Sequence, residues 1–502
     1  MTTPGESPTK LQAQAFRFGV RRLESAVASG DPLLRGDPVR RRLNIALIIS
    51  IVLAVLISGG FAVYGFVKPE PKIGNAAVVI NEDTGGAYVS RDGRLYPAMN
   101  LASALLAAGR GGNGNNAPAS TTVGSDAIGD EPRGPMLGIP GAPNVLPSGS
   151  KLVKALWTVC DTTTDNTALP PGSAPVVRTT AIVGEPAPRA GGIGTTRAML
   201  VSPDAGRTTY LVWQGQRSKI DPGDKTIQLA FDLGAEDAAR PISASLLNII
   251  PQSPDLTVPS IARPTSQPQY ATDLGVTVGE VFGLDRADRT KDVYVALPDG
   301  YQPISRLLAD IIRFQFSQSR TLPLVAPKAL DAAPRTRNPL AVDNYPRTRP
   351  DIVGYERAAV DCVSRRGTDP ATTRVFTSTT VPLPKGAKPV TVTKPSSLTV
   401  DTVYLRPGHG AVFSSTTQAQ KTGARALYLI TDDGVAYPVV SGSALTYLGY
   451  GADDLAPTAP QLLGLLPQGP ALDPDTAAHF YPQTGISASS LPTPSSGESA
   501  SG

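Results

Sequence analysis

The stretch YVALPDGYQPIS (Tyr294–Ser305) decides the fold, because three other segments of the chain share its design. Each has an apolar or β-branched strand, a short polar turn that ends in glycine, and a second strand. Glycine adopts a positive φ without steric cost, so this pattern is a strong signal for a β-hairpin. The hairpins are predicted at AYVSRDGRLYPAMN (87–100), TYLVWQGQRSKI (209–220), VYVALPDGYQPI (293–304) and LYLITDDGVAYPVV (427–440).

Each predicted hairpin turn is a pair of residues whose second member is glycine. The pairs are Asp92-Gly93, Gln214-Gly215, Asp299-Gly300 and Asp433-Gly434. Aspartate favours turns because its carboxylate can accept hydrogen bonds from nearby backbone amides. Turn chemistry therefore explains these acidic residues without a catalytic role.

An amphipathic helix is predicted directly after the first, third and fourth hairpins. After the third hairpin, apolar residues recur at helical spacing on one face: Ile304, Leu307, Leu308, Ile311 and Ile312. Residues with short polar side chains precede these helices and are expected to cap their N-termini. The expected caps are Asn100, Ser305 and either Ser441 or Ser443.

A second level of similarity relates the two halves of the chain. The second hairpin is followed by LLNIIPQSPDL (246–256) and the fourth by LLGLLPQGPAL (462–472), whereas no such tail follows the first and third. Cys160 lies between the first two hairpins and Cys362 between the last two. A hairpin with one helix cannot bury its own apolar face, so such units must pack on neighbours. We therefore expect an α+β fold with pseudo-two-fold symmetry, in which four hairpin–helix repeats surround a central β-sheet.

The two cysteines lie at matching places in the two halves, and a β-branched run follows each of them, at 176–188 and 373–384. In an exported domain, an even number of cysteines suggests a disulfide. The alternative is two buried thiols that never meet. We predict a Cys160–Cys362 disulfide that ties the two halves of the central sheet together.

The domain boundaries follow from these repeats. The expected parts are a cytoplasmic N-terminal segment (1–42), a transmembrane helix (43–67), repeat 1 (68–110), a first central part with Cys160 (130–195), repeat 2 (196–257), repeat 3 (275–325), a second central part with Cys362 (335–395), repeat 4 (400–473) and a disordered tail (483–502).

The predicted transmembrane segment, LNIALIISIVLAVLISGGFAVYGFV, has no charged side chain over 25 residues, and about 20 apolar residues suffice to cross a bilayer. Arg40, Arg41 and Arg42 precede it. The positive-inside rule then predicts a single-pass membrane protein with a cytoplasmic N-terminus and residues 68–502 on the outer side of the membrane. A cleaved signal peptide is the alternative, but the leader and the apolar run are long for one, and no A-x-A site follows.

The charge of the chain is concentrated near its N-terminus. Residues 1–42 hold eight of the 46 basic and four of the 42 acidic residues, which leaves 38 of each sign in the rest. A neutral body of this size argues against a nucleic-acid partner. Within the leader, FRFGVRRLESAVAS (16–29) is a candidate basic amphipathic helix, which could lie on anionic lipid, dock a partner or simply fix membrane orientation.

The sequence contains no catalytic motif, and we expect no catalytic, cofactor or metal site. Its two histidines, His409 and His479, belong to no metal-binding pattern, and no G-x-x-x-x-G-K-[ST] motif for nucleotide phosphates occurs. Ser148 and Lys151 match S-x-x-K, but inside a Gly/Pro/Ser-rich loop. Trp157 and Trp213 could bind sugar, although a core position is favoured for each.

Several blocks of the chain resemble the EccB family, the core membrane components of the ESX or type VII secretion system of actinobacteria. The specific ones are INEDTGGAYVSRDGRLYPAMNLASALL (80–106) and RGPMLGIPGAP (133–143), supported by WTVCDT (157–162), VYVALPDGYQPIS (293–305) and LLPQGP (465–470). The resemblance extends from about residue 11 to 480. The leader, at 11–27, is only loosely similar to the family, and Gln214 replaces the aspartate of the other turns.

The resemblance implies a structural role that agrees with the missing active site. EccB-like proteins assemble in the inner membrane with EccC, EccD, EccE and a mycosin protease, and their periplasmic domains pack as homodimers within a larger oligomer. The family fold has four repeats around a central β-domain joined by a disulfide. Two alternatives remain: an ATP hydrolase of the same system, since some members are labelled ATPases, and a membrane-anchored protein that binds the cell wall.

Overall fold

A computed structural model describes residues 9–30, 38–67, 72–110, 116–163, 177–188, 191–234, 239–287, 290–319, 321–354, 359–392, 398–417 and 425–481. The chain divides into two compact units, Met1–Pro71 and Lys72–Gly502. The predicted disordered tail, 483–502, lies outside the described residues.

The first unit consists of two helices, α1 (Lys10–Ser29) and α2 (Pro38–Val67). Helix α1 begins earlier than the amphipathic stretch predicted at 16–29, and the Gln12 side chain accepts a hydrogen bond from the backbone N–H of Thr9 at its start. Helix α2 contains the apolar segment Arg42–Phe61, with a mean hydropathy of 2.4. Among the described residues, this is the one helix long and apolar enough to cross a membrane.

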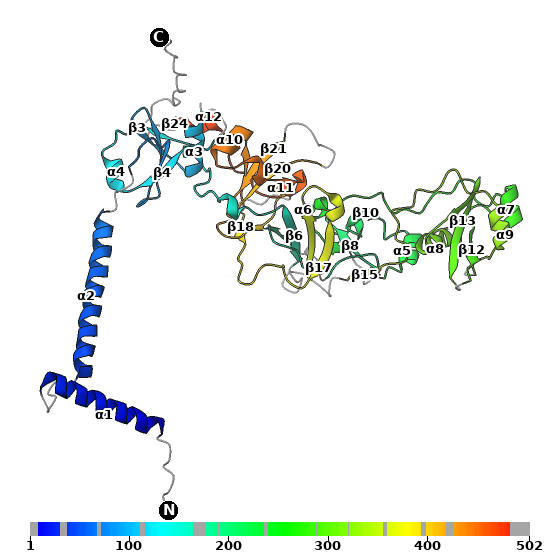
Figure 1. The fold of residues 1–502 in the computed structure, drawn as a ribbon. Helices are drawn as coiled ribbons and strands as arrows, with labels where there is room; N and C mark the ends of the chain where they lie inside the picture. Colours follow the sequence, from blue (N-terminus) through cyan, green and yellow to red (C-terminus); the bar gives the residue numbers. More distant parts are fainter. Residues whose placement is uncertain are drawn as a thin grey trace, which may run out of the picture. The chain divides into compact units, whose positions relative to one another are not determined.

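The second unit contains four repeats with one topology (Figure 1). We number them 1 to 4 in the chain order of their hairpins. In every repeat a first strand pairs with the hairpin, a helix follows, and the chain then runs parallel to the first strand. Repeat 1 comprises β1 (Val78–Asn81), β2 (Ala87–Arg91), β3 (Arg94–Ala98), α3 (Leu101–Gly109), β4 (Ser120–Val123) and α4 (Ser125–Gly129). Repeat 2 comprises β8 (Arg197–Ser202), β9 (Thr209–Trp213), β10 (Gln216–Ile220), α5 (Lys225–Phe231), β11 (Arg240–Pro241) and α6 (Ala244–Ile249).

The second half repeats this order. Repeat 3 comprises β12 (Val281–Asp285), β13 (Lys291–Leu297), β14 (Gly300–Pro303), α8 (Arg306–Gln315) and α9 (Pro327–Ala332), preceded by α7 (Gln269–Leu274). Repeat 4 comprises β20 (Ala411–Ser415), β21 (Ala426–Ile430), β22 (Ala436–Val439), α10 (Gly442–Tyr447), β23 (Leu455–Thr458) and α11 (Pro460–Leu463). The predicted α+β class with four hairpin–helix repeats is confirmed.

The helix caps agree with the sequence pattern. The side chains of Asn100, Ser305 and Ser441 accept hydrogen bonds from backbone amides in the first turns of α3, α8 and α10. A helix that the sequence did not predict, α5, follows the second hairpin, and the Asp224 carboxylate caps it. Its short length and mixed composition hid it from the periodicity analysis.

Repeats 1 and 3 lack the apolar tail, as the sequence indicates, but each has a short helix in the same place. Short helices α4 and α9 occupy the place that α6 and α11 occupy in the other repeats, and Pro132 and Pro334 follow them. After each of the four helices the chain returns to pair in parallel with the second hairpin strand. Helices α4 and α9 bury one hydrophobic side chain each, Ile128 and Leu330. The sequence therefore lacks the apolar run that marks the other two tails.

The four turns differ in geometry from one another. Asp92-Gly93 and Gln214-Gly215 are two-residue turns in which both residues have positive φ, the arrangement that hairpins prefer. In repeat 3, Gly300 instead pairs with Leu297, so the turn is Pro298-Asp299; proline fixes a negative φ and excludes the other geometry. In repeat 4 the loop spans the five residues 431–435, which include Asp433 and Gly434. The expected Asp-Gly pair is thus a two-residue turn in only one repeat.

Replacing Gly300 by alanine is expected to destabilise the second unit more than the same change at Gly93. Gly300 has φ +154°, and a Cβ there would lie 2.4 Å from the Pro334 carbonyl oxygen, whereas a Cβ at Gly93 would meet nothing within 4 Å. Backbone strain applies to both and costs about 1–2 kcal/mol, but overpacking adds about 1–3 kcal/mol at Gly300 alone. Apparent melting temperatures of the full-length chain in detergent check this; equal losses for both variants would contradict it.

Three hydrophobic clusters connect the repeats. Repeats 1 and 4 share one core, which includes Leu106 and Leu445, and repeats 2 and 3 share another, which includes Phe231 and Ile312. Helix α3 packs against α10, and α5 against α8 (Figure 1). The third cluster lies on the central sheet. The repeats thus pair across the two halves, as pseudo-two-fold symmetry requires.

The last described residues complete the sheet of repeat 1. Helix α12 (Pro474–Ala477) packs against α3, and β24 (Phe480–Tyr481) pairs with β5 (Met136–Leu137) beside β3. The Tyr96 and Phe480 rings stack with centroids 5.6 Å apart. The sequence contains no signal for this contact, because β24 has two residues and Phe480 lies 343 positions from its partner Leu137 in β5.

Candidate functional site

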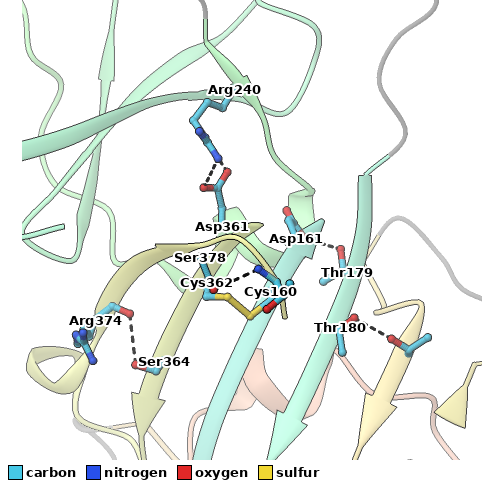
Figure 2. Close-up of a disulfide and its surroundings, with 12 residues drawn as sticks. Cys160, Asp161, Thr179, Thr180, Arg240, Asp361, Cys362, Ser364, Arg374 and Ser378 are labelled. Carbon is cyan, nitrogen blue, oxygen red and sulfur yellow. Dashed lines mark hydrogen bonds and ion pairs between the residues drawn. A yellow bond between two sulfur atoms is a disulfide. The ribbon is translucent and has the colours of Figure 1, made fainter. Parts of the chain in front are cut away.

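The central sheet brings the two halves of the chain together. Its six strands lie in the order β17 (Arg374–Ser378), β16 (Val360–Arg366), β6 (Leu156–Thr163), β7 (Val177–Val183), β19 (Thr402–Tyr404) and β18 (Val390–Thr391). Strands β6 and β16 pair antiparallel, with Cys160 opposite Cys362. The predicted disulfide joins these two residues, and both are fully buried (Figure 2). The local two-fold relation is therefore centred on the disulfide.

The two faces of the sheet have different roles, since side chains alternate along a strand. One face carries the disulfide, Val360 and Phe376. The opposite face carries the cross-strand pair Val159 and Val363 and is covered by α6 and α11, which contact each other. The two similar tails of the sequence, 246–256 and 462–472, thus contribute to the apolar helices that bury this face.

A buried ion pair lies at the end of that covered face. Arg240 and Asp361 are 1% and 3% exposed. The Arg240 Nε and Nη2 atoms donate to the two carboxylate oxygens of Asp361 at 2.9 and 2.7 Å, and Nη1 donates to the Gly354 carbonyl at 2.9 Å (Figure 2). This two-point geometry is the strong form of an arginine–carboxylate contact. It joins β11 of repeat 2 to β16 of the central sheet.

A second buried carboxylate, Asp161, faces Asp361 from the next strand. The two aspartates are register partners in β6 and β16. Asp161 is 1% exposed and accepts hydrogen bonds from the Ser243 N–H at 2.6 Å, the Ser243 hydroxyl at 2.9 Å and the Thr179 hydroxyl at 2.7 Å. Ser243 is also the N-cap of α6, accepting from the N–H of Leu246. Asp161 therefore anchors the start of α6.

Burial dominates the electrostatics of the two aspartates. It raises the pKa of Asp161 to about 6; its hydrogen bonds oppose this shift, and the neighbouring Asp361 carboxylate adds to it. Burial also raises the pKa of Asp361, against the opposing effect of Arg240. Two carboxylates and one guanidinium share a site from which water is excluded, where charge interactions are strong. We call Asp161, Asp361 and Arg240 the charge cluster.

The charge cluster is a buried network whose charged groups bond to one another and to adjoining segments of the chain. Two cavities of about 460 Å³ each are lined by residues of repeats 1 and 3 and their flanking loops, and neither lining includes a member of the charge cluster. Among the described residues, no group of three or more His, Cys, Asp or Glu side chains is placed to hold a metal ion.

The other candidate residues from the sequence analysis lie in separate parts of the structure. Trp157 is buried in the core with its ring 5.6 Å from that of Phe413, and Trp213 is half-buried, its indole N–H donating to the Thr195 carbonyl. Lys151 lies in a short 3-10 helix that starts after Ser148. The side chains of Arg40 and Arg41 lie outside the described part of the chain, and Arg42 is exposed.

Sequence reasoning missed the charge cluster, although one signal for it was present. Asp161 directly follows Cys160, and Asp361 directly precedes Cys362. If the cysteines pair across antiparallel strands, these two aspartates must lie opposite each other. Two carboxylates forced together in a core require a cation, but the sequence does not say which of 46 basic residues supplies it.

Comparison with known proteins gives consistent results. The family model described as "Type VII secretion system ESX-1, transport TM domain B" matches residues 6–481. The chain is 32% identical to "ESX-2 secretion system ATPase EccB2" of Mycobacterium tuberculosis, with 93% of each chain covered. It is also 32% identical to "ESX-3 secretion system ATPase EccB3" of Mycolicibacterium smegmatis, covering 92% of this chain and 89% of the relative.

Solved structures agree with this match. A chain of an intact ESX-5 inner membrane complex superimposes with a TM-score of 0.68 and 26% identity, covering 98% of this chain and 99% of that one. A chain of the EccB3 dimer from the ESX-3 core complex gives a TM-score of 0.66 and 30% identity over 79% of this chain and 98% of that one. Sequence and fold therefore lead to one conclusion: the chain belongs to the EccB family of type VII secretion membrane proteins.

Proposed function

We propose that the chain is a non-catalytic structural subunit of a type VII (ESX) secretion membrane complex, and that its repeat domain contributes to the assembly or conduit. The observation that supports this most strongly is the match of 98% of the chain to a subunit of an intact ESX-5 inner membrane complex. The architecture fits a scaffold, because shared hydrophobic cores and a central disulfide join the four repeats into one domain. Among its described residues, no group of three or more His, Cys, Asp and Glu side chains is placed to hold a metal ion.

The proposal includes the orientation in the membrane. The N-terminus would lie in the cytoplasm, with Arg40–Arg42 at the cytoplasmic end of α2 and residues 68–502 in the periplasm. The positive-inside rule supports this, and so does the disulfide, since disulfides persist outside the reducing cytoplasm. Trypsin added to spheroplasts should digest the repeat domain; full protection of that domain would reverse the orientation.

The proposed partners are the other ESX core components, namely EccC, EccD, EccE and a mycosin protease, and a second copy of this chain. The test is purification of the tagged full-length chain in mild detergent, followed by mass spectrometry and native size measurement. We expect a large assembly that contains an FtsK/SpoIIIE-like motor. Recovery of the chain alone, as a monomer or dimer, would overturn the scaffold assignment.

A second candidate function is ATP hydrolysis, which the names of the EccB2 and EccB3 relatives favour. The sequence has no phosphate-binding G-x-x-x-x-G-K-[ST] motif. The full-length chain, purified free of the motor subunit, should therefore release no phosphate from ATP above a buffer blank. Turnover that survives this purification would support the ATPase reading.

A further inference from the structure

The segment Arg240–Ile249 connects the sheet of repeat 2 to the central sheet. Arg240 and Pro241 pair with β8 of repeat 2, and α6 packs on β6 and β16. Its polar contacts include the Arg240–Asp361 ion pair, the hydrogen bond from Arg240 to the Gly354 carbonyl, and the two hydrogen bonds that Ser243 donates to Asp161. Loss of these polar contacts would leave the segment held on the central sheet by the apolar packing of α6, and so more loosely than before.

The opposite half provides an internal comparison. The tails align 246–256 with 462–472, and the central strands align Cys160 with Cys362. By these alignments Arg240, Ser243, Asp161 and Asp361 correspond to Ala456, Ala459, Val363 and Val159. All four counterparts lie in or against the apolar core of the central sheet. The same junction thus forms in repeat 4 without a charged side chain at any of the four equivalent positions, so the charge cluster is not a requirement of the repeat fold.

The charges around Asp161 do not balance when all groups are ionised. Strand β16 contributes Asp361, and β11 contributes Arg240. Strand β7 contributes Thr179, whose N–H donates to the carboxylate of Asp401 at 2.7 Å; α6 and its cap contribute only hydroxyl and backbone groups. When Asp161 and Asp361 are both ionised, the charge cluster therefore holds two negative charges and one positive charge. Uptake of one solvent proton by the Asp161–Asp361 pair would leave one carboxylate for the guanidinium of Arg240.

We propose that the charge cluster is a proton-sensitive latch that holds segment 240–249 of repeat 2 on the central sheet. The latch closes more firmly when the aspartate pair binds a proton and loosens when both aspartates are ionised. The equivalent junction of repeat 4, segment 456–465, holds no such group and does not respond. A pH change would therefore loosen one end of the central sheet and leave the other unchanged.

The direction of the response follows from the raised pKa of Asp161. Because that pKa is about 6 in the closed state, against an ordinary value of 3.8, the closed state binds the proton more tightly than an opened one. Closure is therefore favoured as pH falls through about 6 and weakened above it. Between about pH 7.5 and pH 5, these two pKa values change the ratio of closed to open forms by about tenfold.

Hydrogen exchange of the full-length chain in detergent tests the latch. Peptides that cover residues 240–250 and 456–466 are compared at about pH 5 and pH 7.5, after correction for the intrinsic exchange rate. We expect about tenfold stronger protection of 240–250 at the lower pH and no change in 456–466. Equal protection of 240–250 at both values, or the same response in both segments, would refute the proposal without any variant.

Two variants identify the responsible group. Asp161→Asn is isosteric and uncharged, so it should remove the pH response and give segment 240–250 at least wild-type protection at pH 7.5. Asp255→Asn, on an exposed residue just beyond the segment, is the matched control and should keep the wild-type response. A response that persists in Asp161→Asn would overturn the assignment. If that variant does not fold, the wild-type comparison of the two segments still decides.

Discussion

Replacing both Cys160 and Cys362 by serine is expected to lower the free energy of unfolding of the second unit by about 5 kcal/mol. The disulfide spans 202 positions, and closing a loop of that length removes much conformational entropy from the unfolded chain. It also joins the two halves at the centre of their shared sheet. The pairing of β6 with β16 and the cores that repeat 1 shares with repeat 4, and repeat 2 with repeat 3, must then hold the halves together. Apparent melting temperature and denaturant midpoint of the full-length chain in detergent measure this loss.

The control for this experiment is the wild-type chain treated with a mild reductant. Both cysteines are fully buried, so the folded wild type should resist reduction and keep its denaturant midpoint. Reduction under denaturing conditions, followed by refolding in reductant, should reproduce the stability of the double variant. A double variant as stable as the wild type would show that strand pairing and the shared cores suffice to hold the halves together.

The features that could be predicted from the sequence are those with local patterns. The hairpins, the caps Asn100 and Ser305, and the disulfide each depend on residues close in sequence or on a repeat that is visible by eye. The turn geometry was harder to predict from the sequence, because a single adjacent residue can change the type of turn. Pro298 shifts the turn of repeat 3 by one residue and places Gly300 in a strand, against the backbone of Pro334.

The features that could not be predicted depend on contacts between distant segments. Arg240 lies 121 positions from Asp361, and nothing around it marks it as buried. Helix α4 has the composition of a loop, and only its packing through Ile128 makes it part of a repeat. The charge cluster also breaks the internal symmetry, since Ala456 and Val159 stand at the equivalent positions. Repeat analysis finds what the halves share and therefore misses what distinguishes them.

Replacing Arg240 by methionine is expected to cost about 3–5 kcal/mol of stability at neutral pH, because it leaves two buried carboxylates without their guanidinium. Methionine roughly preserves the length of the side chain, so lost packing contributes little. The pKa of each aspartate should rise further without the cation, so part of the loss should be recovered as pH falls. Denaturant midpoints of the full-length chain at about pH 5 and pH 7.5 measure the loss of stability at neutral pH and its partial recovery at the lower pH.

The matched control is the double variant Arg240→Met with Asp361→Leu, which removes both charges of the ion pair. Replacing a buried pair by apolar side chains of similar volume is often neutral or stabilising, and repeat 4 already accommodates an apolar junction at Ala456 and Val159. We therefore expect the double variant to be more stable than Arg240→Met alone at neutral pH. If the two variants were equally destabilised, the loss would come from the packing of Arg240 and not from the uncompensated charge of Asp361.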